Sequence, residues 1–348
     1  MNRSSISTTA STATSVDFLM MPLAAWLARP DVLELVVNRP GEVFLETRAG
    51  WERHVCAELS LAQCLALAQA VATYSAQQID ATRPVLSATL PGGERVQFVM
   101  PPAVGQDTVS ITVRKPSQQV WRLADFERSG LFERVVPSSA DRAPHEQALL
   151  DLLAERRYAE FFQLAVHTRQ TIIVSGQTGS GKTTFMKGLV EEIAPAERLI
   201  TIEDAAELTL PNHPNCVHLF YSKGGQGVAQ VSAKQLLESC LRMKPDRILL
   251  AEVRGEECFY FVRVAASGHP GSITSLHAGS CALAFEQMAL MIRESGGGSG
   301  LELPEIKRLL TLVVDVIVQF GHDAQGRYIQ EVYYDPARKQ RVALGAAA

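Results

Sequence analysis

The chain has 348 residues, of which 47% are hydrophobic and 20% are charged, and its formal net charge is -4. This length favours two domains that each bury a core, and the composition argues against a disordered chain. Because there is no long run of Lys or Arg, the sequence does not indicate direct binding to nucleic acid.

The apolar run Leu19–Leu27 is far shorter than the roughly 20 residues that a membrane-spanning helix needs. We therefore predict that it begins the first helix of a folded domain, after a loose polar tail over residues 1–15. The six cysteines form no C-x-x-C pair, so we predict buried apolar thiols and no zinc site.

Residues 16–133 are predicted to form a smaller α+β domain. A helical stripe of apolar residues covers 60–78, and three short β-like segments follow it at 83–90, 95–100 and 109–114. Pro91-Gly92-Gly93 separates the first two of these segments and predicts a hairpin. The polar segment 134–145 contains two prolines and two serines and is predicted to be a linker.

The C-terminal part, residues 146–348, is predicted to be an α/β domain in which apolar strands alternate with helices. The predicted strands are 170–175, 198–203, 247–252, 272–276 and 312–320, and the predicted helices are 144–166, 182–193, 232–243, 256–266 and 281–292. Such strands predict a mainly parallel sheet with helices on both faces, and ligands of these sheets bind beyond the carboxyl ends of the strands. The glycine-rich segment 296–300 is predicted to be a mobile loop.

The segment Gly176–Thr183 fits the pattern G-x-x-x-x-G-K-[ST] and stands between a predicted strand and a predicted helix. Glycines let backbone N–H groups surround phosphate oxygens, and the helix directs the positive end of its dipole at them. We predict that Lys182 binds the β- and γ-phosphates of ATP and that the Thr183 hydroxyl binds Mg²⁺. The predicted nucleotide ligands are Gly176, Gln177, Thr178, Gly179, Ser180, Gly181, Lys182, Thr183 and Thr184.

Three further polar residues end predicted strands of the same domain. Glu252 follows an apolar strand and is predicted to hold Mg²⁺ or to polarise the attacking water. Glu203 is predicted to be catalytic, and helix capping is an alternative role for its neighbour Asp204. A histidine in the place of His277 is more often structural than catalytic, so its position alone leaves its role open.

In this order the motifs resemble the secretion superfamily of hexameric ATPases, and more narrowly the traffic ATPases of bacterial type IV secretion and conjugative DNA-transfer systems. The resemblance implies a RecA-like C-terminal domain, and it assigns catalytic roles to Glu252 and Glu203 and the sensing of nucleotide state to His277. The matching segments cover most of the chain: Val37–Glu42, Arg83–Ser87, Gly93–Gln97, Ser110–Pro116, Gly176–Thr183, Glu203 and its neighbours, Cys240–Pro245, and the strand ends at Glu252 and His277.

Arg95 and Arg114 lie in the predicted N-terminal domain. The sequence alone allows them to be solvated charges or arginines that a neighbouring domain or subunit inserts next to a phosphate. The resemblance implies the second role. It also implies a homo-hexamer that is peripheral to the cytoplasmic face of the bacterial inner membrane and works with other inner-membrane components and a coupling protein. Which carboxylate holds Mg²⁺, and whether DNA, protein or both are transferred, stay open.

Three other functions compete with a motor that powers pilus assembly or substrate transfer in type IV secretion. A pilus-assembly or type II secretion ATPase of the same superfamily would share these motifs. A RecA-like motor acting directly on DNA would need a basic stripe, which the sequence lacks. A small-molecule kinase would leave the N-terminal domain unexplained.

Overall fold

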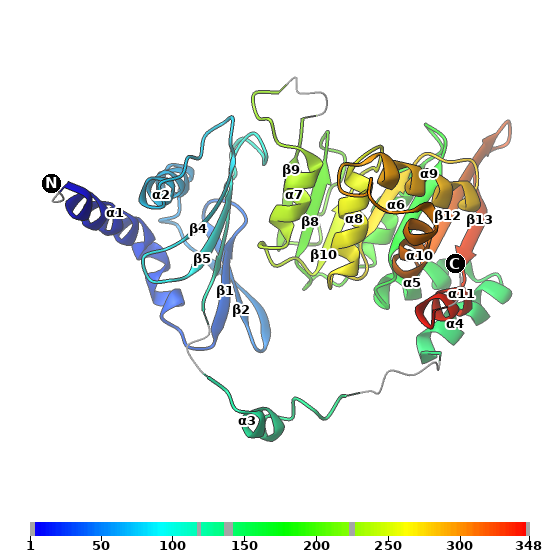
Figure 1. Cartoon of the computed structure of the whole chain (residues 1–348), viewed down its shortest axis with the longest axis horizontal. Coiled ribbons are helices and arrows are strands. Elements are labelled where there is room, and N and C mark those ends of the chain that lie inside the picture. The colour runs from blue at the N-terminus through cyan, green and yellow to red at the C-terminus, as the bar shows by residue number, and fades with distance from the viewer. Residues whose placement is uncertain (1–3, 117–119, 136–141, 223–226, 346–348) are drawn as a thin grey trace.

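The chain folds into two domains that lie side by side and are joined by a long connection (Figure 1). This computed structural model describes residues 4–116, 120–135, 142–222 and 227–345. The N-terminal domain has a six-stranded antiparallel sheet, and the C-terminal domain has a seven-stranded sheet that is mainly parallel. The predicted fold class is therefore confirmed.

The N-terminal sheet has the strand order β3-β2-β1-β6-β5-β4, with helices α1 and α2 packed against each other beside it (Figure 1). Its core contains the fully buried Leu23, Leu67 and Phe98. Ser60 caps α2, because its hydroxyl accepts a hydrogen bond from the Gln63 N–H at 3.2 Å. The elements are α1 (Ser4–Leu27), β1 (Val32–Val37), β2 (Glu42–Thr47), β3 (Gly50–Val55), α2 (Leu61–Tyr74), β4 (Val85–Thr89), β5 (Arg95–Val99) and β6 (Ser110–Arg114).

Two features of this domain differ from the sequence prediction. Helix α1 begins at Ser4, so residues 4–15 are not the predicted loose tail; no Gly or Pro interrupts the segment before Pro22. The strands β1 to β3 were not predicted. β1 and β2 are buried at nearly every position, so they lack the alternation of polar and apolar residues that marks a strand with one solvated face.

The connection between the domains is longer than predicted. It runs from the end of β6 at Arg114 to Pro144, and it contains the short helix α3 (Leu123–Arg128), which lies away from both sheets in Figure 1. Residues 136–141 of the predicted linker are outside the described residues.

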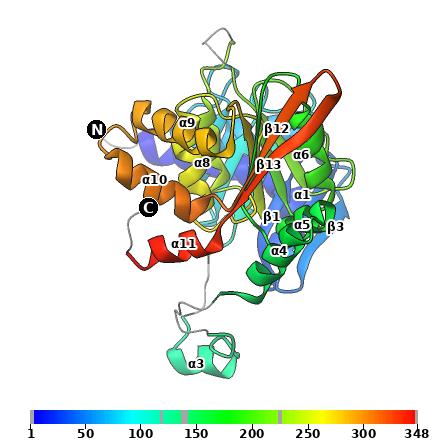
Figure 2. The same cartoon turned by 90° about the vertical axis from the view of Figure 1, so that its right-hand side faces the viewer.

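The C-terminal sheet has the strand order β13-β12-β7-β11-β10-β8-β9, and within it only the β12–β13 pair is antiparallel. Helices cover both faces, as Figures 1 and 2 show. The elements are α4 (Pro144–Ala154), α5 (Tyr158–His167), β7 (Ile172–Gly176), α6 (Lys182–Glu191), β8 (Leu199–Glu203), β9 (Cys216–Phe220), α7 (Ala233–Cys240), β10 (Arg247–Leu250), α8 (Glu257–Ala266), β11 (Ile273–Leu276), α9 (Cys281–Glu294), α10 (Leu303–Val313), β12 (Val316–Asp323), β13 (Gly326–Tyr334) and α11 (Pro336–Ala343).

Several predicted boundaries in this domain are wrong. The single helix predicted over 144–166 is α4 and α5, separated at Arg156, which has a positive φ of 59°. The elements β9, α10, β13 and α11 were not predicted. The segment 296–300, predicted to be a mobile loop, forms a turn in which Gly298 is buried. A β-carbon on Gly298 would lie 2.2 Å from the Ile292 carbonyl oxygen, so only glycine fits there.

The N-terminal domain docks against the β9 edge of the C-terminal sheet. The Phe220 N–H donates to the Ala103 carbonyl at 2.9 Å. The buried Arg198 donates from Nη1 to the side-chain oxygens of Asn38 and Asn215, both at 2.6 Å. Residues of the Val37–Glu42 motif therefore hold the two domains together.

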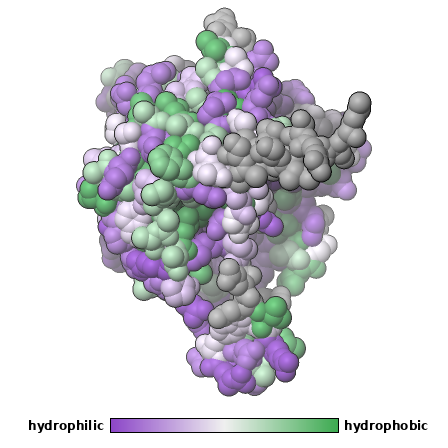
Figure 3. Space-filling view, turned by 90° about the vertical axis from the view of Figure 1, so that its left-hand side faces the viewer, coloured by the Kyte–Doolittle hydropathy of each residue, from purple (hydrophilic) through white to green (hydrophobic). Residues whose placement is uncertain are grey.

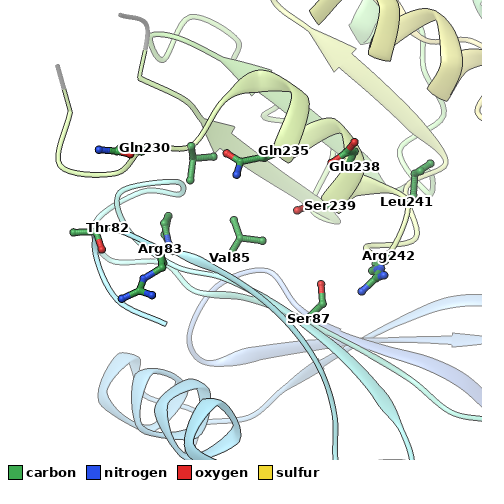
Figure 4. A pocket seen from close by; sticks show the side chains of 12 residues that line it. Thr82, Arg83, Val85, Ser87, Gln230, Gln235, Glu238, Ser239, Leu241 and Arg242 are labelled. Carbon is green, nitrogen blue, oxygen red and sulfur yellow. The ribbon is translucent and has the colours of Figure 1, made fainter. Parts of the chain in front are cut away.

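A cavity of about 950 Å³ lies between the domains farther along this junction. In Figure 4 Arg83 and Ser87 approach it from the N-terminal domain, while Gln235 and Glu238 of α7 lie on the opposite wall.

On the outer face of the N-terminal domain, away from this cavity, apolar and polar side chains are interspersed (Figure 3). No helix in the described part of the chain has both the length and the apolar character to cross a bilayer.

Candidate active site

The glycine-rich loop follows the fully buried strand β7 and ends at the start of α6. Gly176, Gly179 and Gly181 have positive φ values of 155°, 76° and 98°. Gly181 is the N-cap of α6, and no side chain caps that helix, so its free N–H groups face the loop. This is the backbone arrangement that binds phosphate.

Lys182 is folded back into the loop. Its ammonium donates to the carbonyl oxygens of Gly176 and Gln177, each at 2.9 Å, and lies 3.4 Å from His277 Nδ1. Burial lowers the pKa of Lys182, and the charge of Glu252 opposes this shift. Lys182 therefore contacts three other predicted site residues, Gly176, Gln177 and His277.

His277 joins the loop to Glu252. Its Nδ1 is 3.0 Å from the Gly176 carbonyl oxygen, and its Nε2 is 2.9 Å from Glu252 Oε1. The contact of Nδ1 is a hydrogen bond, whereas the contact of Nε2 is a close approach without hydrogen-bond alignment. The histidine therefore contacts both the loop and the Glu252 carboxylate.

Glu252 lies just beyond β10 and is held by a residue that the sequence analysis did not select. Arg254 donates to Glu252 Oε2 and, at 3.1 Å, to Asp204 Oδ2, so it bridges the ends of β10 and β8. Burial acts to raise the pKa of Glu252, but the hydrogen bond and charge of Arg254, with the charges of His277 and Lys182, hold it below its usual value. The position of Arg254, two residues after Glu252 at the ligand edge, is the feature that could have identified it.

Glu203 is fully buried and does not face the loop. It accepts hydrogen bonds from the Thr201 hydroxyl at 2.6 Å and from the N–H groups of Glu207 and Leu208, both at 2.8 Å. His218 Nδ1 is 3.3 Å away. Although burial opposes it, hydrogen bonds to Cys216 and Glu203 raise the pKa of His218 to about 9, so a protonated imidazole faces this carboxylate. In this structure Glu203 holds the turn at 204–208 through these hydrogen bonds, and its catalytic role stays a prediction.

The acid that does face the loop is Glu207, which lies four residues after Glu203. Its Oε2 is 3.4 Å from the Thr183 hydroxyl. With Glu252, these residues form an all-oxygen donor set, the kind that Mg²⁺ prefers. Glu252 Oε1 is buried and accepts no aligned hydrogen bond, which fits an acid that awaits a cation. No group of three His, Cys, Asp or Glu residues in the described segments could hold a metal alone, so phosphate and water would complete its shell.

Arg95 and Arg114 pair in register on β5 and β6, far from the loop in the topology. Arg114 is exposed and has its Nε 3.7 Å from Glu34, and no hydrogen bond or ion pair of the described residues joins either arginine to the loop. The domain that carries them docks at β9, and β7 is four strands away from β9. At about 4.8 Å per strand this separation is roughly 19 Å. The structure therefore does not bring these arginines into the site of their own chain.

The six cysteines are free and buried, as predicted.

Comparison with known proteins places these features in one family. A family model described as "Type II/IV secretion system protein" matches residues 21–331. The type IV secretion system protein VirB11 of Brucella suis is 50% identical over 337 residues, which are 95% of this chain and 93% of that protein. The type IV secretion system protein PtlH of Bordetella pertussis is 42% identical over 326 residues, or 92% of this chain and 96% of that protein.

A solved structure has the same fold over nearly the whole chain. It is the crystal structure of the VirB11 ATPase from the Brucella suis type IV secretion system in complex with sulphate. It is 49% identical, has a TM-score of 0.92 and covers 97% of this chain and 99% of that chain.

Proposed function

The chain belongs to the family of type II/IV secretion system proteins, and from this we propose that it is an ATPase that powers a bacterial type IV secretion system. The convergence of Lys182, His277 and Glu252 on the glycine-rich loop carries the proposal. A phosphate-binding loop needs a cation for the phosphates and an acid for the attacking water, and these side chains supply both.

The residues of this chain have distinct roles in hydrolysis. The loop N–H groups and Lys182 bind the phosphates, and Lys182 exchanges its bonds to Gly176 and Gln177 for bonds to phosphate oxygens. Glu252 orients the attacking water and accepts its proton, and His277 holds that carboxylate in place. Thr183, Glu207 and Glu252 would hold Mg²⁺, which when bound neutralises charge on the phosphates.

We further propose that six copies form a ring on the cytoplasmic face of the inner membrane, with other secretion components and a coupling protein as partners. Arg95 and Arg114 do not reach the loop of their own chain, so in such a ring they would act on the loop of a neighbouring copy. In such a ring ATP would bridge two chains, and its hydrolysis would change how the domains are held.

The test of the ATPase proposal is Lys182→Ala in the full chain. Loss of the ammonium should reduce ATP turnover at saturating nucleotide by about 10²-fold or more, the scale of removing one group that stabilises the transition state. Lys187→Ala, on the same helix, is the matched control and should keep wild-type turnover. If a folded Lys182→Ala variant hydrolyses ATP at the wild-type rate, the loop is not the site of turnover.

A further inference from the structure

The β12–β13 hairpin extends beyond the rest of the sheet next to the glycine-rich loop. β12 pairs with β7 in parallel as far as Phe320 and Gly176, where β7 ends, but β12 continues to Asp323 before the chain turns back at Gly326. Figure 2 shows this hairpin projecting at the top of the domain near α6. The hairpin tip therefore stands at the edge of the sheet where nucleotides bind.

Arg327, on the returning strand, lies against the loop. A β-carbon on Gly181 would be 3.4 Å from Arg327 Cδ and 4.0 Å from its Nη1. Among the described residues Arg327 has no hydrogen-bond or ion-pair partner, whereas Lys182 and Arg254 are both engaged. Its guanidinium thus has no partner in the described part of the chain and lies beside the start of α6.

This placement is unfavourable unless an anion binds there. The N-terminus of α6 carries a partial positive charge, and a cation beside it is repelled. An arginine held at that point by the strand pairing of a hairpin becomes favourable when a phosphate lies between the guanidinium and the helix N–H groups.

We propose that Arg327 is a nucleotide-binding residue that contacts the phosphates common to ATP and ADP. The inference rests on the proposed ATPase function, and it adds a ligand from the C-terminal hairpin to those of the loop. Gly181 belongs to the part of the loop whose N–H groups hold the α- and β-phosphates, so the γ-phosphate is not required for the contact. A guanidinium that binds both nucleotides alike strengthens binding without selecting the transition state.

The experiment compares full-length Arg327→Ala and Arg327→Lys with wild type. The control is Arg308→Ala, which removes the same charge from the exposed face of α10. ATP and ADP affinities are measured at equilibrium, and KM and kcat by steady-state turnover. Loss of one charge-assisted contact should weaken both nucleotides about tenfold in Arg327→Ala and raise KM to match, with kcat nearly unchanged. Arg327→Lys should recover part of the affinity.

Several results would overturn the inference. One is a pair of nucleotide affinities in Arg327→Ala that equal those of Arg308→Ala. A loss of affinity for ATP but not for ADP would contradict contact with the phosphates that both nucleotides share. A change in kcat at unchanged affinity would give Arg327 a role in hydrolysis, and a change in oligomeric state at unchanged affinity would give it a role in assembly. Lys182→Ala tests the proposed ATPase site separately from the role of Arg327. If Lys182→Ala loses turnover while Arg327→Ala binds nucleotide like wild type, only the proposed role of Arg327 is wrong. If neither variant differs from wild type, the nucleotide site itself is wrong.

Discussion

We propose that the loop edge of the C-terminal sheet and the arginine pair of the N-terminal sheet carry complementary halves of one reaction, yet the two regions are built differently. At the loop edge Lys182, His277 and Glu252 already contact one another within a single chain. Arg95 and Arg114 are neighbours in their own sheet but contact no residue of the loop. The loop edge brings its predicted nucleotide-binding residues together within one chain, whereas the two arginines have no contact with the loop of their own chain.

The difference shows which part of the activity each domain can supply. Nucleotide binding needs only groups that follow successive parallel strands of one domain, and the fold brings these together. Neutralising the charge of the transition state with a distant arginine needs a second domain or subunit that brings the arginine to the loop. Hydrolysis therefore depends on how the domains and chains are arranged.

The largest expected effect is on the arginine pair. Changing both Arg95 and Arg114 to Ala should reduce turnover by about 10³-fold or more, because inserted arginines stabilise charge in the transition state. ATP binding should change far less. Turnover and nucleotide affinity of the double variant are measured together, with Arg48→Ala as a control on the β2–β3 turn of the same sheet. Wild-type turnover in the double variant would make these arginines ordinary surface charges.

Mixing variants shows which chain the arginines serve. Lys182→Ala chains keep the arginines, and Arg95→Ala/Arg114→Ala chains keep the loop. If the arginines act on a neighbour, co-assembled rings contain interfaces with both parts intact, and turnover rises above that of either variant alone. If turnover does not rise although mixed rings form, the arginines act within their own chain after a domain movement.

A second large effect concerns Glu252. Glu252→Gln keeps the size of the side chain but removes the charge that orients water, so turnover should fall about 10²-fold while ATP still binds. Glu256→Gln, an exposed neighbour, is the matched control. Turnover at saturating ATP and ATP affinity at equilibrium are measured for both variants and wild type. Affinity that collapses while turnover per bound ATP is unchanged would make Glu252 a ligand instead of a catalyst.

The loop edge was largely predictable from sequence. The family resemblance is confirmed, and the contacts among Lys182, His277 and Glu252 follow from one rule. Each residue follows a parallel strand, and the carboxyl ends of parallel strands meet at one edge whatever their order. The rule does not need the strand order, which the sequence did not provide.

What could not be predicted depends on side-chain direction and on exposed elements. Glu203 and Glu207 are four residues apart, and only the turn after β8 decides that the first is buried and the second faces Thr183. Arg327 was missed because β13 is exposed along most of its length, so its sequence lacks the apolar run of a core strand. Its closeness to Gly181 depends on hairpin register, which local periodicity does not reveal.

A smaller effect is expected at Arg254, which holds Glu252 from the same edge. Removing the guanidinium in Arg254→Ala should raise the pKa of Glu252, since the hydrogen bond and charge of Arg254 are what lower it. Turnover needs the charged carboxylate, so its acid limb should move to higher pH. We expect a loss of about tenfold near pH 6 and less near pH 8. The pH profiles of Arg254→Ala, Arg254→Lys and wild type test this, and an unshifted acid limb would contradict it.

The last effect is on stability and not on turnover, and it concerns the junction between the domains, where Glu34 is almost fully buried. Burial, reinforced by the charge of Glu46, raises the pKa of Glu34 from 4.5 to about 7, while Arg114, Lys244 and Arg198 act in the opposite direction. The folded chain therefore binds a proton that the unfolded chain has released between about pH 4.5 and 7, so Glu34 makes the fold less stable as pH rises through that range.

Glu34→Gln keeps the shape of the side chain and removes the charge, so it should leave stability nearly unchanged at pH 4.5 and increase it above pH 7. The linkage of about 1.4 kcal/mol per pKa unit sets an upper limit of about 3 kcal/mol for that gain. The unfolding midpoints of wild type, Glu34→Gln and the exposed control Glu127→Gln are compared at the two pH values. A gain of equal size at both pH values would mean that the pKa of Glu34 is not shifted by folding. A larger gain at the lower pH would mean that the neighbouring cations outweigh the burial of Glu34.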